Sequence, residues 1–489
     1  MNFNITVGLK PESHIFFGKG SKYCFYINGV PGARLELVTG QTYTFNINAT
    51  GHPFYFTNSE IGGSDDNGPL GGFTATDNGQ VTYTVSSLPS NFYYQCKIHA
   101  YMGAPSIVQE HNTFYTKLVM QDLVAPTSMS YVMEDPSTLY IADQIGRVYR
   151  YDTKNANISV FIDVTEYTPT LRKEYDERGL LGFCFHPEYT TNGRFFIYYS
   201  SIRERKIYGN KKGKGTEDFY NCLSEFTVKD GKVLYEAEKV VLRMDRDYKY
   251  HNGGKIAFGP DGYLYITVGD GGPQGDNKNG QDLSNWFGKI LRINVNTTSS
   301  KYYEVPTDNP FVNVKGAKPE IWAYGLRNPW GMDFYNNMLI VTDAGYETGT
   351  GQEEVNVITK GGMNFGWSIK EGSKFAPWTE RSKKTKKDNF IDPVFSYTTG
   401  DPNFSDEKSS TIIGGFVDRK SGHYICADFS GRLIRLKFTD NKSMSVVETH
   451  SLKKWIRSFG LIGDQMYVLT SNNQGPSGFS GEIYALDVV

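Results

Sequence analysis

Cysteine and histidine are scarce in this chain, which has five and eight of them among 489 residues. An odd and sparse set of cysteines argues against a fold held by disulfides. No apolar run reaches the ~18 residues that a transmembrane helix needs, so no membrane span is expected. The opening residues, MNFNITVGLKPESHIFF, lack a basic stretch followed by an apolar one, and we expect no secretory signal peptide there.

An excess of charge of one sign is missing as well. The chain has 51 basic and 53 acidic residues, which gives a net charge of −2. Because the basic residues are scattered apart from short runs, the sequence offers no basic face for nucleic acid and no polybasic membrane anchor. The compartment stays open: extracellular, periplasmic and particle-surface locations, including a virion, are all compatible with this composition.

Long helical periodicity is rare, whereas short strand-like phrases are frequent. Aromatic residues make up 15% of the chain and there are 52 glycines, which together indicate an all-β protein. In residues 1–110 about seven strand phrases are bounded by Gly, Asn, Asp or Pro, and this spacing predicts an N-terminal β-sandwich. Residues 111–128 are expected to be a linker.

Residues 129–489 loosely repeat one phrase: an apolar strand, a turn, a second strand, and a short strand with Arg or Tyr. The six copies that we distinguish begin near residues 139, 179, 255, 325, 412 and 456. Six units of four-stranded sheet predict a six-bladed β-propeller, which has a polar central channel. The segments 201–220 and 366–410 break the repeat and are expected to be solvent-exposed loops, with a role near the site as the alternative.

One short stretch gathers rare side chains. Residues 93–105 read YYQCKIHAYMGAP and contain a thiol at Cys96, an imidazole at His99 and a thioether at Met102. A mononuclear electron-transfer copper needs one thiolate, two imidazoles and a weak axial thioether. The second imidazole must come from upstream, and His52 in TGHPFYF begins a strand phrase. These four residues are therefore the candidate copper ligands.

Alternatives to copper remain at this point. His14 is the other upstream histidine, but it lies outside the strand pattern. One Cys and two His can also hold zinc, and a metal-free sandwich would use Cys96 as a small core residue. On GHPFYF and YYQCKIHAYMG, residues 20–108 resemble the cupredoxin family of blue-copper sandwiches. The resemblance implies copper and electron transfer, although the gap to Met102 is shorter than in several family members.

The second part of the chain resembles the glucose/sorbosone dehydrogenase family, which includes quinoprotein aldose dehydrogenases and Hedgehog-interacting-protein-like proteins. The resemblance rests on long phrases: ERGLLGFCFHPEYTTNGRFFIYYS, HNGGKIAFGPDGYLYITVGDGG, YGLRNPWGMDF, EEVNVITKGGMNFGW and ADFSGRLIRL. It implies that pyrroloquinoline quinone lies in the propeller channel above a calcium ion, and that the substrate is a sugar or a related alcohol.

The resemblance also implies roles for individual residues. His251 would be the general base that removes the proton from the sugar hydroxyl, because a neutral imidazole can accept a proton near pH 7. Arg327 would pair with quinone oxygens and stabilise the charge that develops there, and Asn328 would add a hydrogen bond. Asp270 is a further catalytic candidate, and Glu177 is expected on the sugar side.

Calcium prefers oxygen ligands. By position in the family motif, the expected ligands are the backbone carbonyls of Gly345, Tyr346 and Phe365 and the carboxylate of Glu354.

The chain departs from the enzyme pattern where cations should meet the cofactor carboxylates. Phe429 and Ser430 stand where a lysine is expected, and on the sixth blade only Arg457 matches clearly. Lys453 or Lys454 is a candidate to compensate. Losing two cations that face a tricarboxylate would weaken quinone binding.

Two functions follow from these observations. In the first, the propeller oxidises a sugar or related alcohol through a quinone and passes electrons to copper in the N-terminal domain. In the second, the propeller is catalytically silent and binds a glycan or protein, with or without a copper-loaded sandwich. The missing cations favour the second function, and the joint presence of His251, Arg327 and the calcium phrases favours the first.

Overall fold

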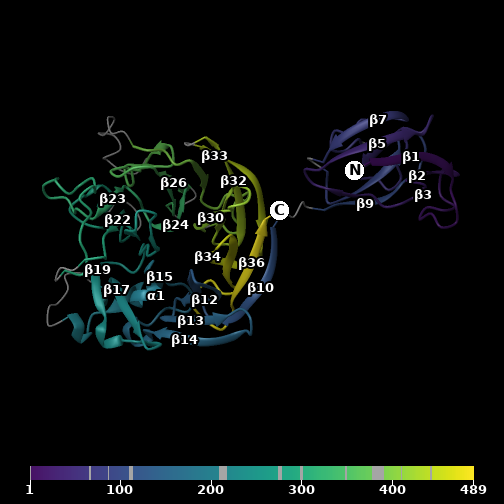
Figure 1. Ribbon diagram of the computed structural model, residues 1–489. Helices are drawn as coiled ribbons and strands as arrows, with labels where there is room; N and C mark the ends of the chain where they lie inside the picture. The colour runs from purple at the N-terminus through teal and green to yellow at the C-terminus, as the bar shows by residue number, and fades with distance from the viewer. Residues whose placement is uncertain are drawn as a thin grey trace. The chain divides into compact units, whose positions relative to one another are not determined.

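The computed structural model forms two compact units, Met1–Thr113 and Phe114–Val489. It describes residues 2–64, 68–85, 88–109, 114–208, 217–273, 278–297, 301–346, 350–376, 390–408, 410–440 and 443–488. Strands dominate both units, and the α-helix α1 (Tyr189–Asn192) is only four residues long. The expectation of an all-β chain is thus confirmed (Figure 1).

The N-terminal unit consists of two sheets. One has the order β3 (Val30–Pro31), β2 (Tyr23–Ile27), β1 (Asn2–Leu9), β5 (Thr42–Asn48) and β7 (Asn78–Thr84). The other has the order β4 (Glu36–Val38), β9 (Ala104–Gln109), β8 (Asn91–Cys96) and β6 (Phe54–Thr57). Two sheets around one shared core make a β-sandwich, as the strand spacing predicts.

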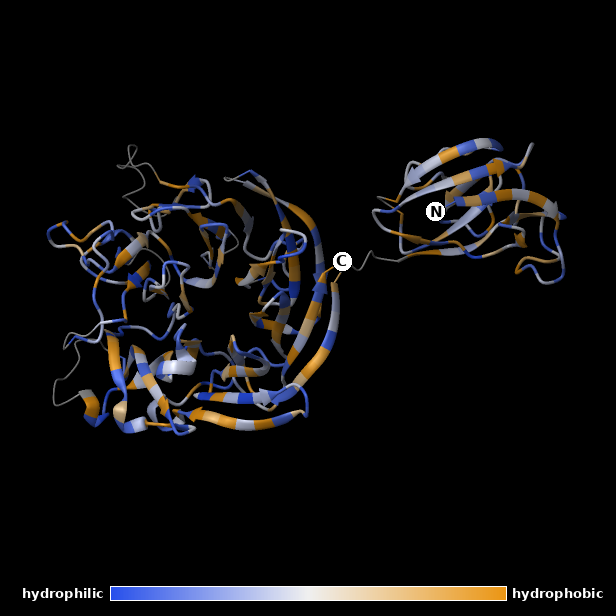
Figure 2. Ribbon diagram, in the orientation of Figure 1, coloured by the Kyte–Doolittle hydropathy of each residue, from blue (hydrophilic) through white to orange (hydrophobic). Residues whose placement is uncertain are grey.

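Aromatic side chains fill the space between these sheets. Buried residues alternate with exposed ones along β5, and Figure 2 shows this alternation of hydrophobic and hydrophilic residues along the strands. The ring of Phe54 lies 5.1 Å from Phe25 and 5.3 Å from Tyr94, measured between centroids. Because Phe25 lies on the first sheet and Phe54 and Tyr94 on the second, these contacts join the two layers.

The second unit contains six sheets arranged as the blades of a propeller, and a separate two-stranded hairpin in the described residues (Figure 1). Blade one holds β11 (Pro126–Val132), β12 (Asp135–Asp143), β13 (Arg147–Asp152) and β14 (Asn157–Asp163). Blade two holds β15 (Leu180–Phe185), β16 (Arg194–Ile202), β17 (Phe219–Lys229) and β19 (Lys239–Asp245), extended by β18 (Lys232–Val233). Blade three holds β20 (Ile256–Phe258), β21 (Leu264–Val268), β22 (Lys289–Ile293) and β23 (Ile321–Tyr324).

The remaining blades follow the same plan. Blade four holds β24 (Pro329–Tyr335), β25 (Met338–Asp343), β26 (Gln352–Ile358) and β29 (Phe395–Thr398). Blade five holds β30 (Ile412–Val417), β31 (Tyr424–Asp428), β32 (Arg432–Asp440) and β33 (Ser443–Ser451). Blade six holds β34 (Trp455–Ile462), β35 (Gln465–Ser471), β36 (Gly481–Val488) and β10 (Phe114–Leu123).

The ring closes through a strand from its own beginning. Strand β10 pairs antiparallel with β36, from Phe114↔Val488 to Leu123↔Gly481. The segment 111–128, expected to be a linker, therefore contributes β10 and the start of β11 to the propeller, and residues 111–113 lie outside the described residues. Phe114, Met120 and Leu123 of β10 are buried in the propeller, and this burial is the physical reason for the difference.

The first strand of each blade is the innermost one. Inner strands of neighbouring blades contact each other at most positions around the channel, and between blades three and four β24 contacts β21. Between blades four and five the approach is so close that a Cβ on Gly331 would lie 2.1 Å from the Cα of Gly414. Only glycine allows two backbones to come this near. All inner strands enter the ring from the same end, so the segments just before them gather at one mouth of the channel.

The segment 366–410 is only partly the exposed loop that we expected. It forms the hairpin β27 (Lys370–Glu371) and β28 (Lys374–Phe375), and β29 completes blade four. Residues 377–389 and 409 lie outside the described residues, as do residues 209–216 of the other segment, 201–220.

Candidate functional site

The four candidate copper ligands lie at one end of the sandwich core. Strands β6 and β8 pair with Phe54 opposite Cys96, which brings His52, just before β6, beside the loop after β8. The sulfur of Cys96 lies 3.9 Å from Nδ1 of His52 and 3.7 Å from Nδ1 of His99. The ligand atoms of these three residues all lie within 4.8 Å of one another.

These separations suit a shared metal ion. With metal–sulfur and metal–nitrogen bonds of about 2.3 and 2.0 Å, tetrahedral to trigonal angles place the two ligand atoms roughly 3.5–3.8 Å apart. The distance from Cys96 Sγ to His99 Nδ1, 3.7 Å, lies within this range, and the distance to His52 Nδ1, 3.9 Å, lies just above it. The donor set of one thiol and two imidazoles therefore fits a copper or zinc ion with little rearrangement.

The surroundings of Cys96 and His52 shift the pKa values of both side chains. Burial raises the pKa of the Cys96 thiol, while the backbone amides of Ile98 and His99, each 3.4 Å from Sγ, oppose that rise by stabilising the thiolate. Burial and the neighbouring His99 lower the pKa of His52, so this imidazole is neutral near pH 7. Neutral imidazole is the form that binds metal.

Met102, the fourth candidate ligand, and His14, the alternative histidine, differ in their surroundings. Met102 is fully buried and belongs to the same core as Cys96, which is compatible with an axial position. His14 accepts a hydrogen bond from the Phe16 amide through Nδ1 and is absent from the ligand cluster. The structure thus groups His52 with Cys96 and His99, and leaves His14 outside.

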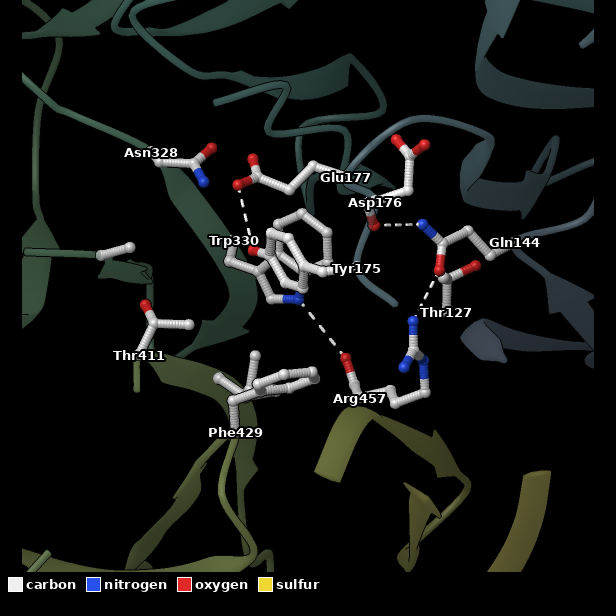
Figure 3. A pocket seen from close by; sticks show the side chains of 12 residues that line it. Thr127, Gln144, Tyr175, Asp176, Glu177, Asn328, Trp330, Thr411, Phe429 and Arg457 are labelled. Atoms are coloured by element: carbon white, nitrogen blue, oxygen red, sulfur yellow. Dashed lines mark hydrogen bonds between the residues drawn. The ribbon is translucent and has the colours of Figure 1, made fainter. Parts of the chain in front are cut away.

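The propeller has a cleft at the mouth where the inner strands begin. It comprises cavities of about 190 Å³ and about 50 Å³ that share six lining residues. The shared residues are Tyr175, Glu177, Asn328, Ala344, Thr411 and Phe429. Figure 3 shows Asn328 and Glu177 on one side of this cleft and Phe429 and Arg457 on the other. The predicted residues His251, Arg327, Asn328, Glu177 and Arg457 all line it.

His251 heads a chain of three buried hydrogen-bonding groups. Its Nδ1 lies 2.7 Å from Oδ1 of Asp270, and Oδ2 of Asp270 accepts a hydrogen bond of 2.8 Å from Nε1 of Trp367. Burial by itself would raise the pKa of Asp270, but His251 and Arg327 outweigh burial and lower it. The ionised carboxylate therefore holds the proton of His251 on Nδ1, which leaves Nε2 able to accept one.

Glu177 positions His251 through the backbone. One carboxylate oxygen accepts the His251 amide at 2.6 Å and the other accepts the Tyr175 hydroxyl at 3.0 Å. His251 has a φ of 55°, in the left-handed region that a non-glycine residue adopts only when its surroundings enforce it. Glu177 lines the cleft as expected, but both of its oxygens already have partners.

Asp343 fixes the two residues that precede the inner strand of blade four. Its carboxylate accepts the amides of Arg327 at 2.8 Å and Asn328 at 2.7 Å. Asp143 does the same in blade one for the amides of Val124 and Ala125. Asp343 was missed by sequence reasoning, yet the repeat contains the signal, because both aspartates end the second strand of a blade.

The side chain of Arg327 lines the cleft and has hydrogen-bond donors that lack acceptors among the described residues. Its Nη1 donates to the Ala344 carbonyl at 3.1 Å, whereas Nε and Nη2 are buried and have no hydrogen-bond acceptor among the described residues. The guanidinium carbon lies 5.6 Å from the ring of Trp367. Buried guanidinium donors without partners are costly unless a ligand oxygen satisfies them.

Arg457 reaches the cleft from blade six. It donates to the Gln144 side chain and to the Gln474 carbonyl, while its Nε is buried without an acceptor among the described residues. Burial lowers the pKa of Arg457 to about 10, so it stays charged at neutral pH. Among the described residues, the lining of the cleft thus includes two buried arginines, Arg327 and Arg457, each with at least one donor that has no acceptor there.

The expected calcium residues lie around a buried group of carboxylates. Glu354 accepts hydrogen bonds from Asn356 and from the Gly372 amide. Close to it, Glu371 accepts the Tyr346 amide at 2.6 Å through Oε1, while its Oε2 is buried and has no donor in the described part of the chain. Phe365 is buried against blades three and four.

Glu371 was missed because it lies in the segment that we expected to be solvent-exposed. Burial and the charge of Glu354 raise its pKa to about 7, against an opposing hydrogen bond from Tyr346. The side-chain oxygen of Asn356 is likewise buried without a donor among the described residues. Glu371 and Asn356 thus offer oxygens without hydrogen-bond donors in the described part of the chain, and the carboxylates of Glu354 and Glu371 repel each other. A divalent cation such as calcium would bind such oxygens and offset this repulsion.

The departures from the enzyme pattern have clear structural consequences. Phe429 lines the cleft, and Ser430 bonds to Asp428 instead of facing a ligand. Lys454 pairs with Glu482 at 2.7 Å, and Lys453 is exposed. No lysine is among the described residues that line the cleft. The suggested compensation by Lys453 or Lys454 is therefore wrong in this structure.

The family model described as "Glucose / Sorbosone dehydrogenase" matches residues 123–477. The chain belongs to this family. The match spans most of the propeller and leaves the N-terminal sandwich outside. The family predicted from the sequence phrases is therefore confirmed.

Several curated proteins are similar to this chain. The HIPL2 protein of Arabidopsis thaliana is 30% identical over 342 residues, covering 59% of this chain and 48% of its own length. The Hedgehog-interacting protein of Mus musculus is 31% identical, covering 49% and 34%. Aldose sugar dehydrogenase YliI of Escherichia coli is 30% identical over 198 residues, covering 40% and 47%. The chain spans about half the length or less of these relatives.

Solved structures agree on the fold. The aldose sugar dehydrogenase of Streptomyces coelicolor, determined in a form with pyrroloquinoline quinone bound, superposes with a TM-score of 0.57 at 23% identity, covering 77% of this chain and 98% of that one. A putative glucose dehydrogenase from Thermus thermophilus gives a TM-score of 0.58 at 22% identity, covering 76% and 99%. The six-bladed propeller is thus confirmed. None of the helices in the described residues is long and apolar enough to cross a membrane.

Proposed function

We propose that the propeller is a quinone-dependent dehydrogenase that oxidises a hydroxyl group of a sugar or a related alcohol. The observation that carries this proposal is the buried chain from His251 through Asp270 to Trp367 beside the unsatisfied donors of Arg327. Removal of a hydride from an alcohol requires a base that takes the hydroxyl proton, and a cation that stabilises negative charge on the oxygens of the acceptor. His251 with a fixed tautomer and Arg327 with donors that lack acceptors among the described residues supply these two groups. The family and its aldose dehydrogenase members support the same reaction class.

Each residue of the cleft has a separate role in the proposed reaction. Nε2 of His251 takes the hydroxyl proton, Asp270 stabilises the imidazolium that forms, and Glu177 holds the His251 backbone in place. Arg327 and Arg457 would hold pyrroloquinoline quinone by its oxygens, and Glu354 with Glu371 would hold calcium. When bound, the quinone supplies the two-electron acceptor. Phe429 closes the cleft with an apolar surface and excludes water.

We propose further that the N-terminal sandwich is a cupredoxin-like copper domain, with His52, Cys96, His99 and Met102 as ligands. The support is the spacing of Cys96 Sγ from two imidazole nitrogens, together with the buried Met102. A copper ion of this kind accepts one electron at a time. Its role would be to take electrons from the dehydrogenase.

A quinone titration tests the first proposal. The full chain, with calcium present or chelated, is titrated with pyrroloquinoline quinone and followed by calorimetry, and aldose oxidation is then followed with a dye as acceptor. We expect saturable binding in the micromolar range or tighter, calcium-dependent binding and dye reduction by an aldose. Absence of both binding and dye reduction rejects the enzyme.

A metal titration tests the second proposal. We expect Cu(II) to bind at one equivalent per chain and to give an intense thiolate-to-copper absorption band in the visible range. A protein that takes up zinc but stays colourless with Cu(II) would instead be a zinc-binding sandwich.

A second candidate function is a catalytically silent propeller that binds a glycan or a protein. One observation favours it: no lysine lines the described cleft, and Phe429 stands at the place where the enzymes put a cation. In this case the chain binds calcium through Glu354 and Glu371 but shows no binding of the quinone. The same titration therefore separates the two functions.

A further inference from the structure

A second cavity lies at the opposite mouth of the propeller channel. Its volume is about 360 Å³, within the range of small-molecule sites. It is lined by the ends of the inner strands and the turns that follow, including 128–134, 183–187 and 255–258. The cleft described above lies before those strands begin, and the two share no lining residue.

Most of the lining of this distal cavity is apolar. Aromatic rings come from blades one, two, three and five, and aliphatic side chains include those of blades four and six. Its larger apolar members are Phe183, Phe185, Phe258, Met332, Phe416 and Leu461. Such a lining binds the hydrocarbon part of a ligand through burial of apolar surface.

One lysine interrupts the apolar lining. Nζ of Lys255 lies 6.0 Å from the centre of the Phe416 ring, and both residues line the distal cavity. No carboxylate forms a salt bridge with Lys255 among the described residues. The nearby carboxylate of Asp333 is already paired with Arg419 at 3.0 Å and with the Val417 amide at 2.8 Å. Glu134, the other charged residue of the lining, is exposed.

The environment of Lys255 disfavours its charge. Burial lowers the pKa of its amine to about 8, and only Cys184 and Asp333 act in the opposite direction. An ammonium group without a counter-ion in apolar surroundings is destabilising, and an anionic ligand would offset that cost. A lone lysine without an arginine fork suits a singly charged group better than a phosphate.

We propose that the distal cavity binds a small amphipathic carboxylate, with its carboxylate on Nζ of Lys255 and its hydrocarbon part against Phe416, Met332 and Leu461. This site is separate from the dehydrogenase cleft and does not depend on quinone or copper. Its ligand is a monocarboxylic acid with an alkyl or aryl body.

Octanoate and octanol are suitable probes because they share a chain length and differ in charge. Each is titrated by calorimetry into the full chain and into three variants: Lys255→Met, Lys255→Arg and the exposed-site control Lys232→Met. We expect octanoate to bind Lys255→Met at least tenfold more weakly than wild type, about 1.4 kcal/mol, and octanol to bind both similarly. Lys255→Arg retains octanoate binding, and Lys232→Met behaves as wild type.

A cavity-filling variant keeps the test decisive if Lys255→Met does not fold. Leu461→Trp should weaken octanoate and octanol alike by about tenfold or more, because the indole occupies the space of the alkyl chain. The proposal is overturned if wild type shows no saturable octanoate binding. It is equally overturned if Lys255→Met or Leu461→Trp binds octanoate as tightly as wild type.

Discussion

The sandwich cluster and the propeller cleft differ in how far apart their residues lie along the chain. Cys96 ends β8, His99 lies in the loop that follows, and His52 lies before the strand that pairs with β8. The cleft instead takes His251 from blade three, Arg327 from blade four and Arg457 from blade six. The first site needs one strand pair, whereas the second needs a closed ring.

Because of this difference, we expect the two sites to respond differently to mutation. A local site is lost when one ligand is changed and is insensitive to distant packing. A distributed site is weakened by any change that opens the ring, even one far from the cleft. The following four variants test whether the two sites respond in these different ways.

The largest effect is expected for Cys96→Ser, which should abolish the visible copper band. The hydroxyl cannot replace the thiolate, which supplies the soft covalent bond to copper. Absorption after titration with Cu(II) measures the change. The matched control is Cys24→Ala, a buried cysteine of the same sandwich that lies outside the cluster. Persistence of the band in Cys96→Ser would mean that the metal lies elsewhere.

Next, His251→Ala should lower kcat for aldose oxidation by about 10²–10⁴-fold, since it removes the general base. Steady-state kinetics with a dye acceptor measure this, and quinone affinity should change little. His450→Ala, on the outer strand of blade five, serves as the control. If kcat in His251→Ala equals that of wild type, another group accepts the proton.

Phe114→Ala tests whether the distributed site depends on ring closure. Phe114 is 2% exposed on β10, and its truncation should destabilise the propeller by about 3 kcal/mol. All six tryptophans lie in residues 286–455, so tryptophan fluorescence during urea unfolding reports on the propeller alone. Tyr115→Ala, at an exposed neighbour, should have little effect. Equal stability of the two variants would show that 111–128 acts as a linker after all.

The smallest effect concerns acid stability of the sandwich. Burial and the charge of Lys10 lower the pKa of His14 to about 4, from an unfolded value near 6.5. Between these values the unfolded state binds more protons, so stability falls by about 1–3 kcal/mol as pH drops from 6.5 to 4. Hydrogen exchange of residues 2–109 at several pH values measures this. His14→Phe should flatten the profile over that interval, and an unchanged profile would contradict the assignment.

Much of the fold was predictable from the sequence because the strand phrases recur at regular spacing. Cys96, His99 and Met102 were candidates for a local reason, since they lie within seven residues of one another. His52 lies 44 residues before Cys96 and comes beside it through the pairing of β6 with β8. Asp343 and Glu371 were not recognised. Asp343 acts through backbone amides of Arg327 and Asn328, and Glu371 meets Tyr346 only when its hairpin folds back onto blade four.

The sequence by itself determined the two β units and the family of the propeller, and it pointed to His52, Cys96 and His99, which the structure groups together. Only the tertiary structure decided that β10 closes the ring, that Lys454 pairs with Glu482, and that Lys255, in a largely apolar cavity, has no salt-bridge partner among the described residues. The physical reason is how far apart along the chain the interacting residues lie. Strand periodicity and ligand spacing act over a few residues, whereas burial, charge pairing and cavities depend on residues that meet only after the blades assemble.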